Sequence, residues 1–271
     1  MMPQVDCWRF VSKKSPTLMK SSSLIWRPSL RVGLCSLALV FALICLAGVS
    51  EAQQHINKRF VAGKNVRIEL RNISGTIVVE TWNKDEIRLS ATLESPNAHV
   101  VPKQIDQSLV VDVMNDNRGR GDVGDVNFKL QVPVNSSVDL ETKRGNIYVS
   151  NIRAGSVRAH VSSEGDIELT NIVASQVMAQ NTIGNIFFDG EFSRGGTYEF
   201  KSTQGDITIR IPGNSAFRLV AASPARKIAL GDFWNNGFKT QDGRKYVGDV
   251  GDGRSSVSVT NFTGQITFMR K

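Results

Sequence analysis

Two aspartates come closest, in type and spacing, to a catalytic pair. Asp166 and Asp206 each follow a glycine and precede an isoleucine, in the segments "EGDIELTNI" and "QGDITIRIP". If these segments stack as strands two places apart, the carboxylates lie about 10 Å apart, near the upper end of the spacing of inverting glycosidases. Asn146 and Asn185, however, stand at the same place in two related segments. Because acid–base chemistry needs a carboxylate, this exchange favours a polar turn residue beside glycine.

The other residue types that commonly carry chemistry form no recognisable site. His55, His99 and His160 are not spaced like metal ligands. Ser162 and Ser163 follow His160 closely, but no third group is placed to orient a nucleophile. All three cysteines lie in the first 52 residues. The sequence therefore predicts no catalytic residues, no metal site, no cofactor and a protein that is not an enzyme.

Two loops rich in glycine and aspartate raise the question of calcium binding. They span Asn115–Asp125 and Asn235–Ser256, and both contain the sequence "GDVGD". Asp and Asn side chains supply the oxygen ligands that calcium prefers, but neither loop matches a complete ligand frame. We interpret both as solvated loops and leave calcium binding open.

The glycine beside each of these Asp or Asn residues belongs to a repeat. The pattern Gly-Asp/Asn-Ile recurs at steps of 20, 19 and 21 residues, with outlying copies at Gly75 and Gly264. Apolar and polar residues alternate in and between the copies, which is typical of β-strands. Because so short a unit cannot bury its apolar face alone, the copies are expected to stack. The sequence thus predicts an all-β protein, a β-solenoid. It would be a single-stranded β-helix-like stack of about 20-residue rungs with an N-terminal lead-in β-sheet as a cap.

Each repeated residue has an expected role in this stack. Glycine supplies a turn conformation that is closed to residues with a Cβ atom. The isoleucines point inward and form one aliphatic stack, and the asparagine after the strand tolerates a left-handed turn and can pair with its copy in the next rung. The predicted structural residues are Gly145, Ile147, Asn151, Gly165, Ile167, Asn171, Gly184, Ile186, Gly205 and Ile207.

The regularity of the pattern divides the chain into regions. Apolar and polar residues alternate in residues 53–134, but the regular repeat is missing there. We therefore expect this region to form a β lead-in that caps the first rung. Residues 135–271 contain the repeats and are expected to form the solenoid. The two regions together are expected to be one continuous domain.

The first 52 residues predict a signal peptide. Val32–Val49 carries no charge, Arg27 and Arg31 precede it, and the small residues that follow suit cleavage after Ala52. The long region before the apolar stretch suggests that the true start is Met19. The alternative is an uncleaved N-terminal anchor.

Removal of this segment moderates the charge of the chain. The full sequence has a net charge of +8, but residues 1–52 hold six of the 33 Lys and Arg and two of the 25 Asp and Glu, which leaves +4. No cluster of basic residues is interleaved with aromatic residues, as a nucleic-acid surface requires. The sequence predicts a secreted or periplasmic protein of the cell envelope. It predicts no nucleic-acid partner and, after cleavage, no stable membrane span.

Four segments resemble a known family when taken in order. "VRIELRNISGTIVVETWNKDEIRLSATLE" is similar to that family's opening hairpin, and "NFKLQVPVNSSVDLETKRGNIYVSNI" to its Val-Pro passage, around Pro133. The Gly-Asp/Asn-Ile ladder follows, and "SSVSVTNFTGQITFMRK" resembles the final strand. The family is the bacterial putative-adhesin family of β-strand-repeat domains of unknown function, and the resemblance spans about Asn57 to Lys271. The resemblance implies a β-strand-repeat fold and secretion. It implies no catalytic residue, because none is established for the family.

These observations lead to one expected function and two alternatives. The expected function is that of a secreted non-catalytic β-repeat protein of the bacterial envelope, an adhesin, binding or scaffold module. The first alternative is a β-helix enzyme acting on polysaccharide, which needs carboxylates that converge on one groove. The second is an envelope-stress sensor or partner domain held by the uncleaved anchor. The sequence does not identify the partner, and the candidates are an envelope polysaccharide and another envelope protein.

Overall fold

The computed structural model describes residues 53–63, 65–115 and 123–271. The predicted signal peptide lies outside the described residues, as does part of the first Gly/Asp loop. Apart from one 3-10 turn, η1 (Gly231–Phe233), every regular element in the described part is a β-strand, which confirms the all-β prediction. Within the described ranges, no helix is long and apolar enough to cross a membrane.

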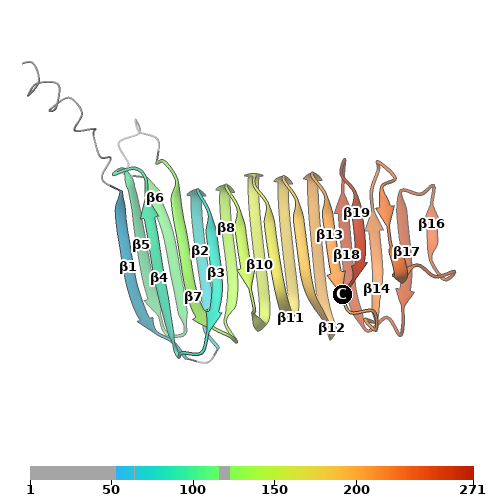
Figure 1. The fold of residues 1–271 in the computed structure, drawn as a ribbon, viewed down its shortest axis with the longest axis horizontal. Helices are drawn as coiled ribbons and strands as arrows, with labels where there is room; N and C mark the ends of the chain where they lie inside the picture. The colour runs from blue at the N-terminus through green and yellow to red at the C-terminus, as the bar shows by residue number, and fades with distance from the viewer. Residues whose placement is uncertain (1–52, 64, 116–122) are drawn as a thin grey trace, which may run out of the picture. The chain divides into compact units, whose positions relative to one another are not determined.

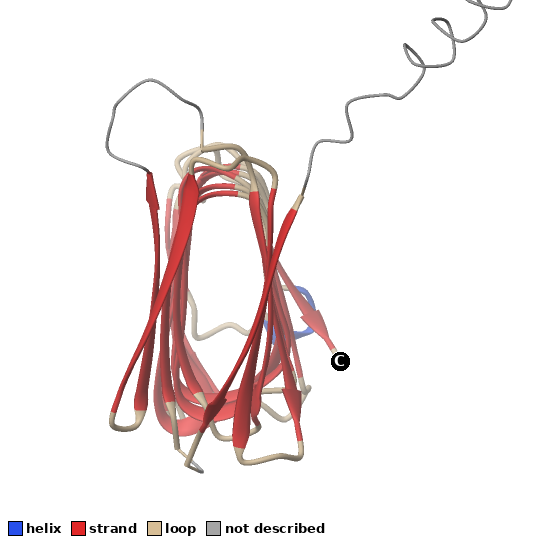
Figure 2. Ribbon diagram, turned by 90° about the vertical axis from the view of Figure 1, so that its left-hand side faces the viewer, coloured by secondary structure: helices blue, strands red, loops and turns tan. Residues whose placement is uncertain are grey.

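The strands form two walls that face each other across the core (Figure 1 and Figure 2). β11 (Ile167–Ile183) and β12 (Ile186–Gln204) bend and run through both walls. The rest of the first wall, in spatial order, is β5 (Ala98–Ile105), β6 (Ser108–Asn115), β2 (Arg67–Ser74), β8 (Ser137–Arg144) and β10 (Arg153–Glu164), then beyond β12, β18 (Ser255–Asn261), β14 (Phe217–Ala222), β17 (Lys245–Val250) and β16 (Lys239–Gln241). The rest of the second wall is β1 (Gln54–Val61), β4 (Glu86–Leu93), β7 (Val126–Pro133), β3 (Ile77–Trp82) and β9 (Ile147–Ser150), then beyond β12, β13 (Ile207–Ile211), β19 (Ile266–Arg270) and β15 (Ile228–Ala229).

Neighbouring rungs in the middle of the molecule pair in parallel and in register. In the second wall, Ile147 pairs with Ile167, which pairs with Ile186, which in turn pairs with Ile207. These four side chains are at most 1% exposed. Because adjacent strands lie about 4.8 Å apart, the isoleucines form a continuous apolar stack along the core.

Segments that are far apart in the sequence lie side by side at both ends of this stack. The rung β2–β3 lies between β6–β7 and β8–β9, although residues 83–136 separate it from β8 in the chain. Likewise, β18–β19 lies between β12–β13 and β14–β15. The outlying copies of the repeat at Gly75 and Gly264 therefore extend the central stack directly. Residues 53–134 contribute two pairs of parallel-stacked strands, β2–β3 and β6–β7, as well as the antiparallel strands at that end.

Glycine turns stack directly on one another along one corner of the molecule. Gly145 donates its N–H to the carbonyl of Glu164 at 2.8 Å, and Gly165 donates to Ile183 at 2.8 Å. A Cβ atom on any turn glycine from Gly145 onward would overlap the carbonyl oxygen of the preceding turn glycine. The stacked glycines are Gly75, Gly145, Gly165, Gly184, Gly205 and Gly264.

Buried polar side chains hold the carbonyl groups of these turns. Asn181 donates from Nδ2 to the carbonyl of Gly165 at 3.2 Å, and Asn261 donates to that of Gly205 at 2.8 Å. Thr142 and Ser202 occupy matching positions and donate to turn carbonyls through their hydroxyl groups. Since buried carbonyl groups need partners, these side chains help to fix the turns; in β10 the matching position is the apolar Val161.

Gly165→Ala tests the glycine stack. The new methyl group would overlap the carbonyl of Gly145 at a backbone φ of +152°, so we expect the free energy of unfolding to fall by more than about 3 kcal/mol. Gly243→Ala is the matched control, because Gly243 also has a positive φ, of +68°, but no atom lies within 4 Å of the added Cβ. We expect a loss of about 1 kcal/mol there. Equal losses in urea unfolding would contradict a steric role for the stack.

Candidate ligand-binding groove

The Asp and Asn residues of the repeat form a hydrogen-bonded ladder along the glycine corner. The backbone N–H of Asp166 donates to Oδ1 of Asn146 at 2.9 Å, and the N–H of Asn185 donates to Oδ1 of Asp166 at 2.6 Å. The ladder continues from Asp206 to Asn185 at 2.9 Å and from Gln265 to Asp206 at 2.8 Å. Each position needs only an oxygen that accepts a hydrogen bond, which explains why Asp and Asn exchange. Asp166 and Asp206 are each engaged in separate turns and do not converge on a cleft.

The predicted asparagines lie at a second corner. Asn151 and Asn171 adopt left-handed backbone conformations with φ of 62° and 55°. Nδ2 of Asn171 donates to Oδ1 of Asn151 at 2.8 Å, so this corner also carries a short side-chain ladder. The predicted repeat residues thus lie in the core or at the corners, and none of them lines a pocket described below.

The histidines lie on separate strands. Nδ1 of His55 lies 3.1 Å from Oγ1 of Thr92, and His160 lies on the first wall beside Glu141 and Gln180. Among the described residues, no three His, Cys, Asp or Glu side chains are grouped so that they could hold a metal ion.

Two aspartates of the second Gly/Asp segment, Asp249 and Asp252, are paired with arginines. Arg218 donates to both carboxylate oxygens of Asp249, at 2.8 and 3.1 Å, and these hydrogen bonds lower the pKa of Asp249. Asp252 forms an ion pair with Arg254. A calcium ion would have to displace both arginines, so the geometry does not favour a calcium site here. The prediction of one continuous loop is wrong, because β16 and β17 pair with each other as antiparallel strands within this segment and β17 also pairs with β14.

The first wall carries a groove that crosses five neighbouring strands, β2, β8, β10, β11 and β12. Two hollows of about 420 and 400 Å³ adjoin there and share Ser156, Arg158 and Gln176. Four strand spacings give the groove a length of about 19 Å. The other outward-facing lining residues include Arg67, Ser137, Asp139, Met178, Thr197 and Glu199.

The groove arises from two rows of outward side chains that differ in length. Ser156, Gln176 and Thr197 pair in register and form one row. Two residues further along each strand, Arg158, Met178 and Glu199 form the next row. Ser156 and Thr197 are short while Arg158, Met178 and Glu199 are long, so the first row is lower than the second at both sides of Gln176, the one long side chain in that row.

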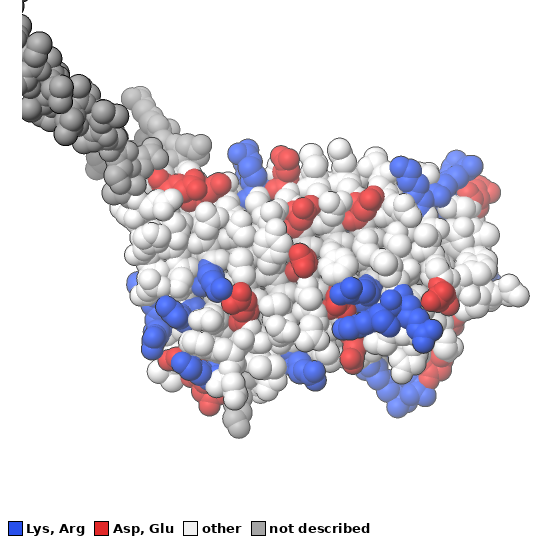
Figure 3. All heavy atoms as spheres, viewed as in Figure 1, with Lys and Arg blue, Asp and Glu red and all other residues white. Residues whose placement is uncertain are grey.

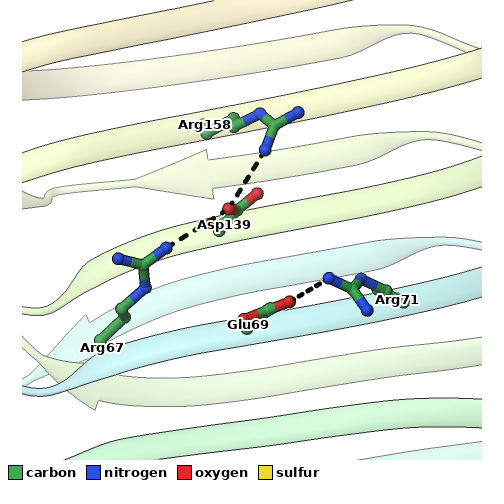
Figure 4. A network of polar contacts seen from close by, with 5 residues as sticks. All are labelled: Arg67, Glu69, Arg71, Asp139 and Arg158. Atoms are coloured by element: carbon green, nitrogen blue, oxygen red, sulfur yellow. Dashed lines mark hydrogen bonds and ion pairs between the residues drawn. The ribbon is translucent and has the colours of Figure 1, made fainter.

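Charged side chains of opposite sign meet at one end of the groove. Arg67 from β2 and Arg158 from β10 approach Asp139 on the intervening strand β8 from both sides (Figure 4). Their nitrogens lie 3.7 and 3.4 Å from the same oxygen, Oδ2 of Asp139. The Asp139 side chain is 22% exposed, whereas those of Arg67 and Arg158 are 64% and 47% exposed. Elsewhere, acidic and basic side chains are interspersed over the face of the stack seen in Figure 3.

A buried carboxylate lies on the second wall, outside the groove. Asp189 is 4% exposed and contacts Arg210 at 2.6 Å and the C-terminal residue Lys271 at 3.0 Å. Burial raises the pKa of Asp189, but the hydrogen bonds and positive charges of Arg210 and Lys271 outweigh it and hold the pKa below its ordinary value of 3.8. We call the three residues Asp189, Arg210 and Lys271 the clasp, because their ion pairs join Lys271 and β13 to β12.

A family model matches residues 120–268 and is described as "Toastrack DUF4097". The chain belongs to the Toastrack family. This confirms the predicted resemblance to the putative-adhesin family of unknown function. The matched range contains the central rungs and the last rung of the Toastrack chain, but not Arg67 at the end of the groove. No curated protein matches the sequence.

Three solved structures resemble the Toastrack chain. A "putative cell adhesion protein" from Clostridium sporogenes is 12% identical with a TM-score of 0.50, over 81% of this chain and 100% of its own. A "putative adhesin" from Bacteroides fragilis is 12% identical with a TM-score of 0.42, over 83% and 100%. A "putative lipid binding protein" from Parabacteroides distasonis is 10% identical with a TM-score of 0.27, over 80% and 97%. At these identities the likeness concerns the fold alone.

Asp166→Asn tests whether the ladder needs a charge. The amide oxygen still accepts the hydrogen bond from Asn185, so we expect a change in unfolding free energy within about 0.5 kcal/mol. Asp166→Ala leaves that N–H without its acceptor and should cost about 1 kcal/mol. Urea unfolding measures both, and an Asn variant as unstable as the Ala variant would contradict the acceptor role.

Asp189→Asn tests the clasp through its pH dependence. A carboxyl group whose pKa is lower in the folded state stabilises the fold above its unfolded-state pKa and loses that contribution as the pH falls through its folded-state pKa. We expect Asp189→Asn to cost about 2 kcal/mol at pH 7 and the difference from the unsubstituted chain to shrink as the pH falls below 3.8. The exposed Asp242→Asn should match the unsubstituted chain in urea unfolding at both pH values. A difference that stays constant with pH would rule out the charged clasp.

Proposed function

We propose that this Toastrack chain is a secreted, non-catalytic binding module of the bacterial cell envelope that holds an extended polymer in the groove of its first wall. The observation that carries the proposal is the course of the groove across five rungs of one continuous wall. A site about 19 Å long and open along its length suits a linear chain better than a compact small molecule. The strands beneath it are paired on both sides, so the lining groups are held in fixed positions.

The arrangement of carboxylates favours binding over hydrolysis. Asp139 and Glu199 both line the groove, but they lie three strand spacings apart, about 14 Å, which exceeds the separation that glycosidases use. Asp139 is also occupied by two arginines. Asp166 and Asp206 accept backbone hydrogen bonds at the opposite end of the rungs. A polysaccharide hydrolase therefore has no carboxylate pair in this groove.

We propose further that the stack is a β-solenoid of single coils of about 20 residues, each with one strand in each wall. The parallel, in-register pairing of β8–β9 with β10 and β11 supports this classification. The localisation remains a proposal that rests on the sequence of residues 1–52.

Gln176→Trp tests the groove as the binding site. An indole at the centre of the groove should fill it and reduce binding of purified residues 53–271 to an array of envelope polysaccharides by at least tenfold. Glu168→Trp is the matched control, because Glu168 is an exposed residue of the same strand, β11, in the opposite wall. A polysaccharide that binds should also keep its chain length after incubation with the protein. Shortening of the polysaccharide would contradict a non-catalytic role. Equal binding by both variants would exclude this groove.

Mass spectrometry of the protein produced in a bacterial host tests secretion. Cleavage after Ala52 gives a mature chain that begins at Gln53. A chain that keeps residues 20–52 in the membrane fraction would instead favour an anchored module.

A further inference from the structure

We infer that the polymer held in the groove is anionic, a polysaccharide bearing carboxylate groups, and that Arg67 and Arg158 bind these groups. The inference rests on the proposed function, because it takes the groove as the binding site. It adds the chemical class of the ligand and the residues that select it.

Hydrogen-bond donors dominate the end of the groove near β2. Asp139 is the only acidic residue among the side chains that line this hollow. Arg67 and Arg158 can only donate hydrogen bonds, whereas Asn65, Ser137, Ser156 and Gln176 can donate or accept them. Two guanidinium groups against one carboxylate leave an excess of one positive charge among the lining residues, and the neighbouring Glu69 on β2 is balanced by its own ion pair with Arg71 (Figure 4). A ligand that brings negative charge and several acceptor oxygens therefore complements this hollow best.

The arginines of the groove keep donors available for a ligand. A guanidinium group carries five N–H donors in a fixed fork. In the described contacts, Arg67 and Arg158 each reach Asp139 through one nitrogen at 3.4 Å or more. Arg218 shows the contrasting case, because it engages both oxygens of Asp249 at 2.8 and 3.1 Å. Asp139 thus orients the two groove arginines without saturating them.

The shared contact on Asp139 brings the two guanidinium groups together. Their backbones lie two strand spacings apart, about 10 Å, yet both side chains reach the same oxygen, Oδ2. One carboxylate above Asp139 can therefore contact Arg67 and Arg158 at once. Because Asp139 is more buried than either arginine, the surface offered to the ligand is the cationic one.

The other half of the groove suits a sugar ring better than an acyl chain. Met178 supplies a small apolar patch between Arg158 and Glu199. Glu199 accepts a hydrogen bond from Nε2 of Gln180 at 3.0 Å and, with Thr197, can accept hydrogen bonds from sugar hydroxyl groups. One methionine offers too little apolar surface for a lipid chain. The sequence of cationic, apolar and acidic patches along the groove fits an acidic polysaccharide.

Titration of alginate hexamers into the purified protein tests the inference, with carboxyl-reduced hexamers as the neutral form of the same polysaccharide. We expect the reduced hexamers to bind at least tenfold more weakly, and the affinity for the acidic form to fall as salt rises. Arg158→Gln and Arg67→Gln should each weaken binding of the acidic form about tenfold. Lys201→Gln removes the same charge from an exposed residue of the same wall outside the groove and should bind like the unsubstituted chain. Arg158→Lys keeps the positive charge but loses the planar set of guanidinium N–H donors. Its affinity should lie between those of the unsubstituted chain and Arg158→Gln.

The outcomes separate the inference from the proposed function. Equal affinity for acidic and reduced hexamers, lost in Gln176→Trp but kept in Arg158→Gln, would overturn the inference and leave the groove as a binding site. Arg158-dependent binding to vesicles containing phosphatidylglycerol, with no binding of alginate, would overturn it in favour of a phosphate ligand. A chain whose polymer binding survives Gln176→Trp would instead contradict the proposed function. Thermal unfolding of each variant confirms that a loss of binding does not reflect a loss of fold.

Discussion

The stacking of glycine turns along one corner is the constraint on which the rest of the structure depends. Each turn glycine lies so close to the carbonyl of the previous one that no side chain fits between them. This closeness keeps successive rungs at strand spacing, about 4.8 Å, so that their backbones pair in register. In-register pairing in turn places isoleucine on isoleucine in the core. A wider turn at any rung would disrupt the strand spacing, the in-register pairing and the isoleucine stack together.

The same constraint explains why the residues that resembled catalytic groups are structural. Once the glycines fix the spacing, the next residue of each turn lies within hydrogen-bonding distance of the backbone in the neighbouring rung. Asn146, Asp166 and Asn185 each use one side-chain oxygen there. Neither a charge nor a proton is needed for that task. The groups available for recognition therefore lie elsewhere, on the outward rows of the walls.

The sequence predicts the middle of the fold well because the information there is local. The spacing of Gly145, Gly165, Gly184 and Gly205 and the alternation after each glycine are enough to predict strands, turns and an inward isoleucine row. The order of the rungs at both ends could not be predicted, because pairing between segments as far apart as β12 and β18 is decided by tertiary contacts. The matching pattern at Gly75 and Gly264 was the available signal for those positions.

The groove escaped sequence analysis for the same reason. Arg67, Asp139 and Arg158 come from three separate segments and form no motif. The alternation of buried and outward residues in β8 and β10 is enough to predict that Asp139 and Arg158 lie side by side on the outer face of the wall. It does not predict that Arg67 lies beside them. The residues become a site only when β2 takes its place beside β8.

The fold itself does not require the charges of the groove. Stability comes from the inward rows and from the hydrogen bonds at the corners, whereas exposed ion pairs contribute only about 0–1 kcal/mol. The long contacts of Arg67 and Arg158 with Asp139 place these pairs among the weak ones. A wall whose strands are paired on both sides nevertheless holds the backbones of Arg67 and Arg158 two strand spacings apart, on either side of the strand that carries Asp139. Charges carried at such fixed intervals can meet the repeating groups of a polymer with little loss of conformational freedom on binding. In this way the regular spacing imposed by the glycine corner also sets the spacing of the outward side chains that line the proposed binding groove.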